Sequence, residues 1–447
     1  MPETSAPQPA RILKLHSVAA PAPSGGPPAP TADHRWRWAT VQVAPHRLGF
    51  FLAMVVLVAA SGWWLAVQLG RAGGSYPQAV AVPTTLTHAV VMVMGFMPLF
   101  FAGFLFTAGP RWLGVEPLPV ARLRGALFLQ AAGWLGWLAG AWLPVWVSVA
   151  GLALALVGLC RMYALFWGLI RISPAQDRVH AKAVGVGGVV GIACLVGVLW
   201  AVVAGGHTDV ALVLVRTALW GWIVVTFVAV AHRMIPFFTS GVLPMIEVWR
   251  PFWVLWLMLG VAAFEVLAVW VDWAAPSASA WPAWTVLVIV VEAAVGCTLL
   301  WLAVVWGLVQ SLKIRLLGML HLGFMWFGLA LVWSALSQGL WLATGQAVLG
   351  LGALHAATMG FLGSTMIAMV TRVCCGHSGR SLVADNLVWA LFMALQLAVV
   401  VRLAAAVQGA PNWLTPAAAA LWLVVMLAWS LRYGNWLGRP RADGKPG

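Results

Sequence analysis

The sequence predicts an all-α polytopic membrane protein with about twelve transmembrane helices and both termini in the cytoplasm. Of its 447 residues, 63% are hydrophobic and only 8% are charged, whereas a soluble domain carries about 25% charged residues. The apolar residues also form runs of about 20, the length that crosses a hydrocarbon core of about 30 Å. Nearly all basic residues lie on one side of these runs, which fixes the expected orientation.

The spanning segments are expected to be helices, because lipid offers backbone groups no hydrogen bonds. The weak alternating pattern of a membrane β-barrel is absent. The formal net charge of +14 does not indicate a nucleic-acid-binding protein, since the basic residues lie in short loops and form no stripe with interleaved aromatic residues.

The chain divides into two tails and one transmembrane domain. Residues 1–45 are rich in Pro, Ala, Gly and Ser, which predicts a disordered cytoplasmic tail. No apolar stretch precedes residue 48, so no cleavable signal is expected. Residues 46–438 form the predicted twelve-helix domain, and 439–447 form a basic cytoplasmic tail.

The apolar runs follow one another with short loops that leave no room for an extramembrane domain. They lie at residues 48–69, 86–108, 125–143, 145–170, 183–204, 209–231, 251–273, 283–309, 316–341, 347–371, 386–405 and 414–436.

The basic residues predict the orientation. All but three of the 25 Lys and Arg residues lie in one alternate set of loops or in the terminal segments. The positive-inside rule therefore places both termini in the cytoplasm, most simply in a bacterial inner membrane, and requires an even number of spans.

Two histidines lie within apolar runs that both begin on the outer side. His88 opens the second run, and His355 lies about eight residues into the tenth, so both are expected in the outer half of the bilayer. Each begins a His-Ala-x-x-Met pattern. Two imidazoles at equal depth on different helices could bind one haem iron from both faces. The alternative is two unrelated histidines that each bond a neighbouring helix.

Two of the basic exceptions, Arg216 and Arg402, lie at the outer ends of the sixth and eleventh runs. Arginine pairs with carboxylates in bidentate fashion, so either could bind a haem propionate; the alternative is snorkelling to lipid phosphate. Small residues after the histidines (Gly95, Gly103, Gly360 and Gly363) would admit either a flat macrocycle or a neighbouring helix.

Four further histidines are expected near the inner ends of helices. They are His46, His232, His321 and His377. Imidazole suits copper, and Cys374 and Cys375 would suit Cu(I), so an inner copper site is a candidate, although none of the spacings is a metal motif. A helix break is expected at Pro236. The acidic residues appear isolated, and Glu292, near the middle of its run, is expected to face the bundle interior.

Several blocks of this sequence resemble the NnrS family. They are Pro45-His46-Arg47, HAVVMVMGFMPLFFAGFLFTAGPRWLGVEP at 88–117, HRMIPFFT at 232–239, LHLGF at 320–324 and LHAATMGFLGSTMIAMVTRVCCGHSGRSL at 354–382. The resemblance spans residues 45–440 with the blocks in order. It implies a twelve-helix membrane protein with haem and copper, linked to denitrification and to tolerance of nitric oxide.

The second-helix block departs from the family pattern Trp-His-Ala-His-Glu-Met. Here Val90 and Val91 stand where the family has the second histidine and the glutamate. The chain therefore resembles a divergent branch, and the resemblance leaves copper binding open.

Three functions follow as hypotheses. The first is a b-type haem-binding, or haem-copper, membrane protein of the nitric-oxide response that handles nitric oxide or an iron-nitrosyl species. The second is a quinol-linked redox protein with a bis-histidine haem, and the third is a cofactor-free transporter of a small molecule. The absence of His-His, His-x-Tyr-His and His-Pro-Glu motifs argues against a haem-copper oxidase. Whether the protein is an enzyme stays open.

Overall fold

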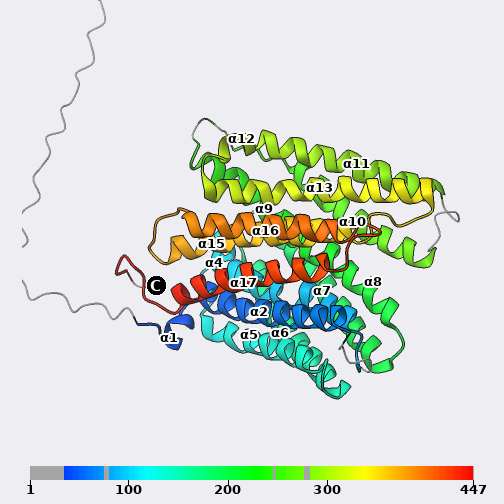
Figure 1. Ribbon diagram of the computed structural model, residues 1–447. Helices are drawn as coiled ribbons and strands as arrows, with labels where there is room; N and C mark the ends of the chain where they lie inside the picture. The colour runs from blue at the N-terminus through cyan, green and yellow to red at the C-terminus, as the bar shows by residue number, and fades with distance from the viewer. Residues whose placement is uncertain (1–34, 75–79, 244, 246–247, 276–281, 446–447) are drawn as a thin grey trace, which may run out of the picture. The chain divides into compact units, whose positions relative to one another are not determined.

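The computed structural model describes residues 35–74, 80–243, 245, 248–275 and 282–445. Within these ranges the chain is almost entirely helical and contains no strand. The long helices run side by side in a bundle (Figure 1). The all-α fold class predicted from composition is confirmed.

The helices follow the order of the predicted apolar runs. They are α1 (Trp38–Val41), α2 (Pro45–Ala72), α3 (Thr84–Val90), η1 (Val91–Gly95), α4 (Phe96–Leu113), α5 (Val120–Ala139), α6 (Val145–Ile172), α7 (Val179–Ala204), α8 (Thr208–Ala218), η2 (Leu219–Val224), α9 (Val225–Ser240), α10 (Phe252–Ala274), α11 (Pro282–Val305), α12 (Leu308–Ser311), α13 (Arg315–Thr344), α14 (Gly352–His355), η4 (Ala356–Gly363), α15 (Ser364–His377), α16 (Asn386–Ala404) and α17 (Leu414–Leu437). The η segments are π-helical and join the helices on either side into continuous spans.

Eleven helices among the described residues have the length and hydropathy of a membrane span. The other long helix, α5, has 20 residues, enough to cross the hydrocarbon core. Arg122 and Arg124 in its first turns make it less apolar than the rest. The expected twelve helices therefore correspond to eleven clear spans and α5, which packs against α2 and α6.

The predicted boundaries agree with the structure to within a few residues for most spans. They differ more where charged residues or glycine determine where a helix begins. The third span, α5, begins at Val120 instead of 125, because its basic first turn lies within the helix. The tenth span begins at Gly352 instead of 347, since Gly350 adopts a positive φ of 45° in the preceding turn. His355 is consequently the fourth residue of its span.

Pro236 does not break its helix as expected. It lies inside α9, which continues to Ser240. The Thr239 hydroxyl donates to the carbonyl of Ile235 at 2.9 Å within this last turn. Proline is tolerated in membrane helices when neighbouring groups satisfy the backbone around it.

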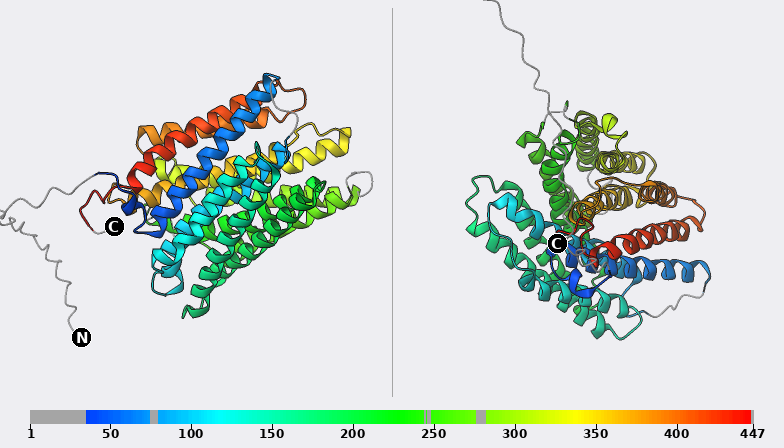
Figure 2. Two further views of the ribbon diagram at one scale, coloured as in Figure 1. Left: turned by 90° about the horizontal axis from the view of Figure 1, so that it is seen from below. Right: turned by 90° about the vertical axis from the view of Figure 1, so that its left-hand side faces the viewer.

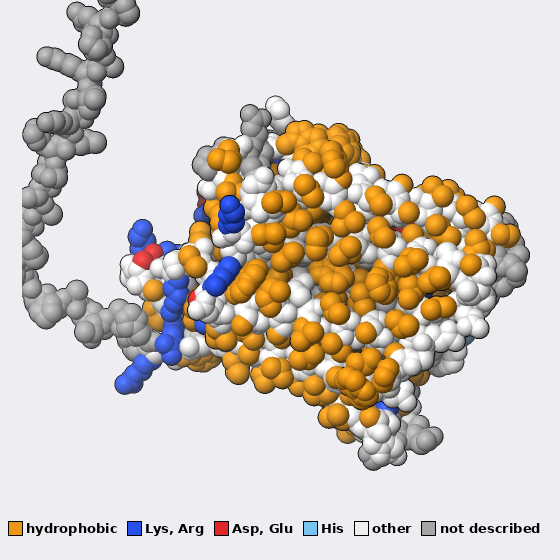
Figure 3. Space-filling model, turned by 45° about the horizontal axis from the view of Figure 1, so that its top comes forward, with side chains coloured by type: hydrophobic (Ala, Val, Ile, Leu, Met, Phe, Trp, Pro, Cys, Tyr) orange, Lys and Arg blue, Asp and Glu red, His pale blue; other side chains and the backbone are white. Residues whose placement is uncertain are grey.

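Both ends of the described chain meet at one end of the bundle, here called the terminal end. The Arg37 amide donates to the carbonyl oxygen of Gly438 at 2.8 Å, and α17 packs along α2 although the two are far apart in sequence (Figure 2). Most Lys and Arg side chains visible in Figure 3 gather at this end, and hydrophobic side chains cover most of the remaining surface in that view.

The two predicted tails differ from expectation where they can be seen. Residues 1–34 lie outside the described residues. Residues 35–44, assigned to the disordered tail, are packed: Val41 is fully buried, and the Trp38 ring contacts Phe51. In the C-terminal segment, Arg47 donates to the carbonyl oxygen of Arg439 at 2.8 Å. Aromatic anchoring and backbone capping thus order both segments against the bundle.

Glycine allows the closest helix crossing near the first span. A Cβ atom on Gly49 of α2 would lie 2.7 Å from the Gly103 amide nitrogen of α4. Gly360 likewise admits Trp326, whose ring a Cβ there would meet at 2.7 Å. For Gly103 and Gly360, the structure therefore favours helix packing.

Candidate functional site

A cavity of about 440 Å³ lies at the end of the bundle opposite the terminal end. Helices α2, α3, α4, α8, α10, α14, α16 and α17 contribute to its wall, together with the π-helical segments. All four residues predicted to bind the cofactor line it: His88, His355, Arg216 and Arg402. We call it the histidine cavity.

The two histidines lie at matching places in their spans. His88 is the fifth residue of the span that begins at Thr84, and His355 is the fourth of the span that begins at Gly352. The two imidazoles are close enough to interact electrostatically with each other and with Arg402. The two histidines that the sequence singled out therefore line one cavity.

Each imidazole is held in a defined orientation. His355 Nδ1 lies 2.9 Å from the carbonyl oxygen of Leu351, so Nδ1 carries the proton and Nε2 is left free as an acceptor or ligand. The His88 ring stacks on the Trp64 ring at a centroid distance of 3.7 Å. His88 Nδ1 is buried and has no hydrogen-bond partner among the described residues.

The π-helical segments mark the same site. The three in the described chain, η1, η2 and η4, follow His88, Arg216 and His355 by one to three residues. A π-turn inserts an extra residue and shifts the register of the side chains that follow, and such turns are frequent at functional sites. Here they rotate all three spans next to the cavity.

The repeated His-Ala-x-x-Met pattern has a structural counterpart. Met92 and Met359 line the cavity one turn after His88 and His355, respectively. Each of these two walls therefore presents an imidazole and a thioether. Apolar side chains such as Phe96 complete the wall.

The two arginines differ in their partners. Arg216 lies close enough to Asp272 to interact with its carboxylate, and both line the cavity. Arg402 is half-buried and makes no salt bridge with any described residue. It is thus a cation in the cavity wall without a protein anion, next to both histidines.

Two acidic residues of the cavity were not anticipated. Asp209 accepts a hydrogen bond from Trp273 Nε1 at 3.1 Å, and Asp272 accepts one from Trp284 Nε1 at 3.4 Å. Both lie at the ends of helices. Their sequence positions gave no signal, because the pairing with tryptophans comes from other helices.

The acidic residues at membrane depth are not isolated, contrary to expectation. Glu292 is 1% exposed and accepts a hydrogen bond from Ser334 Oγ at 2.8 Å, so it does face the bundle interior. Glu265 of the neighbouring helix α10 is 8% exposed and interacts with it. Neither residue lines the histidine cavity.

The four inner histidines do not converge on one site. His46 and His377 contact each other with ring centroids 4.3 Å apart. Arg47 and Arg441 lie beside them, and Arg441 donates to the His377 carbonyl at 3.3 Å. A metal cation would be repelled by these guanidinium groups.

His232 bonds His180 instead of the other candidates. Its Nδ1 lies 3.0 Å from His180 Nε2, and its Nε2 lies 3.1 Å from the Pro251 carbonyl oxygen. The carbonyl can only accept, so His232 Nε2 donates and His180 Nε2 donates to Nδ1. Both ring nitrogens of His232 are then engaged. His180 lies in the first turn of α7 and is buried.

His321 is also engaged elsewhere. Its Nε2 lies 2.9 Å from Thr239 Oγ1, whose own proton goes to Ile235. Within the described ranges, no three His, Cys, Asp or Glu residues come together as a metal site. Cys374 and Cys375 are buried free cysteines. The inner copper site expected from residue types therefore does not fit the structure.

The positions that depart from the family pattern lie in the core. Val90 and Val91 are fully buried and do not line the histidine cavity. The side chain of Val91 packs against Gly95. Nothing at these positions offers a metal ligand.

Comparison with known proteins gives one match. A family model described as NnrS protein matches residues 40–441. No curated protein and no solved structure matches the chain.

Proposed function

Because the chain belongs to the NnrS family, we propose that it binds a b-type haem in the histidine cavity and acts in the nitric-oxide response. Membership of the family suggests a haem- and copper-containing membrane protein of that response. In this proposal the protein handles nitric oxide or an iron-nitrosyl species and so protects the cell or serves denitrification.

The convergence of His88, His355 and Arg402 on one cavity carries the proposal. Imidazole is a common ligand of haem iron, and His88 and His355 are the residues that would hold it. An arginine without a protein anion suits a propionate. The volume of about 440 Å³ lies within the range of cofactor pockets, about 300–1,000 Å³.

The chain's own groups would orient the macrocycle. His355 is held by Leu351 and His88 by Trp64, so neither ring needs to reorganise on binding. Met92 and Met359 line the same cavity and would offer the macrocycle apolar contacts. When bound, haem would supply an iron that stores an electron and, once one of the two imidazoles leaves it, binds a diatomic gas. Asp209 and Asp272 would direct the propionates away from their side of the cavity, towards Arg402.

Copper alone is a less suitable ligand of this cavity. Two imidazoles and two thioethers are ligands that Cu(I) accepts, and the cavity contains both kinds. A single ion, however, would leave most of the volume empty. Metal analysis of the purified protein separates the two: haem gives one iron per chain, and copper alone gives copper without iron.

The absorption spectrum of the purified protein tests the proposal. We expect a Soret band, a b-type pyridine haemochrome and a shift of the Soret band when nitric oxide is added to the reduced protein. A preparation from haem-sufficient cells without a Soret band would refute haem binding and leave the cofactor-free transporter. Reduction of the haem by a quinol would instead favour the redox protein.

We also propose that the terminal end faces the cytoplasm of a bacterium and the histidine cavity faces the outer side of its inner membrane. The concentration of basic residues at the terminal end supports this orientation. A reporter fused after residue 447 that is active only in the cytoplasm is expected to be active. Activity of a periplasm-specific reporter there would invert the orientation.

A further inference from the structure

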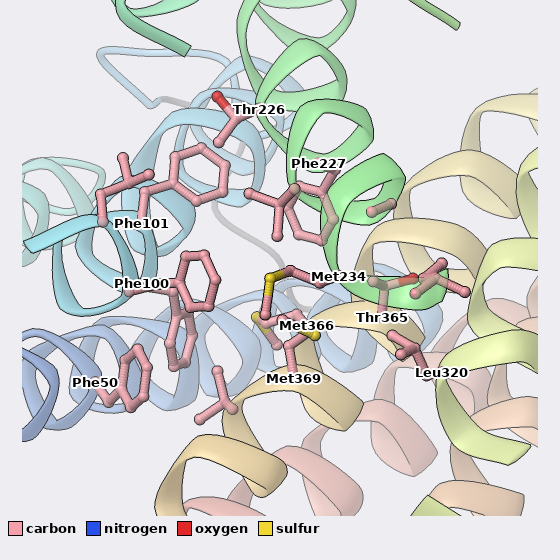
Figure 4. Close-up of a pocket in the computed structure, with 16 residues that line it drawn as sticks. Phe50, Phe100, Phe101, Thr226, Phe227, Met234, Leu320, Thr365, Met366 and Met369 are labelled. Atoms are coloured by element: carbon pink, nitrogen blue, oxygen red, sulfur yellow. The ribbon is translucent and has the colours of Figure 1, made fainter. Parts of the chain in front are cut away.

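A second, smaller cavity lies in the interior of the bundle. Its volume is about 60 Å³, and five spans surround it. Its wall consists of Phe, Leu, Val, Ile, Ala and Met side chains with two threonines. Figure 4 shows Phe100 and Phe101 on one side and Met234, Met366 and Met369 converging from the other. We call it the apolar chamber.

Polar groups contribute almost nothing to the chamber. The Thr226 hydroxyl donates to the Trp222 carbonyl at 2.9 Å. The Thr365 hydroxyl has no partner among the described residues. A buried water typically needs two to four polar partners, and cavities lined by apolar side chains stay dry and accept apolar atoms such as xenon. The chamber therefore suits a small, weakly polar molecule better than water.

The chamber continues the histidine cavity along the same helices. Met97, Ile223 and Leu362 line the histidine cavity, and Phe101, Phe227 and Met366 line the chamber. Each pair is separated by four residues on one span, about 6 Å along a helix. The two spaces are therefore consecutive.

Side chains separate the two spaces. Phe227 packs edge-on against Phe101 at a centroid distance of 5.7 Å and against Phe361 at 5.9 Å. Aromatic edges of this kind are held by dispersion and quadrupole contacts and not by hydrogen bonds. A diatomic molecule could pass when these rings move, with no backbone bond broken.

The side of the chamber away from the histidine cavity is the least buried one. Phe104, Val230 and Met234 line it and are half-buried, whereas most other lining residues are buried. On their helices these three lie further towards the terminal end than Phe100 and Phe227. Apolar gases are more soluble in hydrocarbon than in water. We therefore expect the gas to enter the chamber from the membrane, through this less buried side.

We propose that the apolar chamber is a docking site for a small apolar gas, nitric oxide in this protein, from which the gas reaches the histidine cavity. The identity of the gas rests on the proposed function, whereas the existence of the site does not. The chamber would hold one diatomic molecule about one helical turn from the histidine cavity, so that a molecule that leaves that cavity would be retained nearby and could return.

Xenon pressure on crystals of the purified protein tests the site directly, because xenon occupies dry apolar cavities and scatters anomalously. We expect one xenon peak surrounded by Phe101, Phe227 and Met366. The filling variant Ala231→Phe should lose the peak, and the enlarging variant Met366→Ala should retain it with equal or higher occupancy. The matched control Val203→Phe places the same ring on an exposed position of α7 and should leave the peak unchanged.

Rebinding of nitric oxide after a light flash tests the connection to the haem. In the wild type, a fraction of the dissociated gas should rebind from within the protein; Ala231→Phe should lose most of that fraction, and Val203→Phe should keep it. No xenon in wild type and Met366→Ala would overturn the site. Xenon binding with unchanged rebinding in Ala231→Phe would overturn the link to the histidine cavity. A protein that binds xenon but shows no Soret band would refute haem binding without contradicting the docking site.

Discussion

The imidazole of His88 stacks on the indole of Trp64, with ring centroids 3.7 Å apart and an interplanar angle of 17°. The guanidinium group of Arg71 also lies over the Trp64 ring, 5.5 Å from the ring centroid. Arg71 in turn donates to Thr84 Oγ1 at 2.6 Å. Two spans, α2 and α3, therefore fix the plane of His88 before any cofactor binds.

Trp64 is accordingly expected to act as a positioning residue for His88. Replacement by leucine removes the stacked surface and lets the imidazole rotate, so Trp64→Leu should retain less haem per chain and show a mixture of low-spin and high-spin spectra. Trp64→Phe, which keeps an aromatic face, should restore most of the low-spin signal. Equal haem content and identical spectra in Trp64→Leu and wild type would contradict this role.

Arg402 should matter more for haem retention than Arg216. Neither arginine forms a salt bridge with a described residue, but Arg216 lies near enough to the Asp272 carboxylate to interact with it electrostatically. We expect Arg402→Ala to weaken haem binding about tenfold or more, because a charge-assisted hydrogen bond contributes about 1.5–3 kcal/mol. Arg402→Lys should recover part of this affinity. Transfer of haem to apomyoglobin measures this. A larger loss in Arg216→Ala would reverse the assignment.

His232 is expected to stabilise the fold and not to bind metal. His232→Ala leaves His180 Nε2 and the Pro251 carbonyl without a partner, which should cost about 1–3 kcal/mol and lower the unfolding temperature in detergent. His207→Ala, at an exposed position, serves as the control and should change stability by about 0.5 kcal/mol or less. Unchanged stability together with loss of bound copper in His232→Ala would instead show that His232 is a metal ligand.

Asp385, which caps the N-terminus of α16, should make the free energy of unfolding depend on pH. Burial raises the pKa of this carboxyl, but the hydrogen bonds from the Val388 amide and from Arg432 outweigh it and hold the pKa below its usual value. Its stabilisation is therefore present above the unfolded pKa, about 3.9, and is lost as pH falls through the lowered folded value. Asp385→Asn keeps the helix cap but should show less loss of stability on acidification than wild type. Identical pH profiles would contradict this.

The sequence alone predicted those features of the fold and the site that are determined within one helix at a time. Apolar run length located the spans, and the depth of ionisable residues within them singled out His88, His355, Arg216 and Arg402, which share one cavity. Family membership was predicted from short blocks in the right order and is confirmed. These features can be read one helix at a time.

Features that depend on contacts between helices could not be predicted. His180 pairs with His232, 52 positions away, and Glu265 with Glu292 on the next helix. Of the four inner histidines, His46 contacts His377, whereas His232 pairs with His180 and His321 with Thr239. They therefore form no group of three potential metal ligands among the described residues. The π-helical segments shift side-chain register by one residue, which no 3.6-residue pattern anticipates. The apolar chamber likewise exists only because five helices leave a gap.

The most direct test of the central claim is the spectrum of the purified protein with each cavity histidine replaced in turn. We predict that wild type shows a low-spin, bis-histidine haem in optical and electron paramagnetic resonance spectra. His88→Ala and His355→Ala should each convert it to high-spin, five-coordinate haem or lose it, and the double variant should lose it, whereas His46→Ala should match wild type. An unchanged low-spin spectrum in the double variant would show that the haem, if bound, lies elsewhere, and would contradict the account.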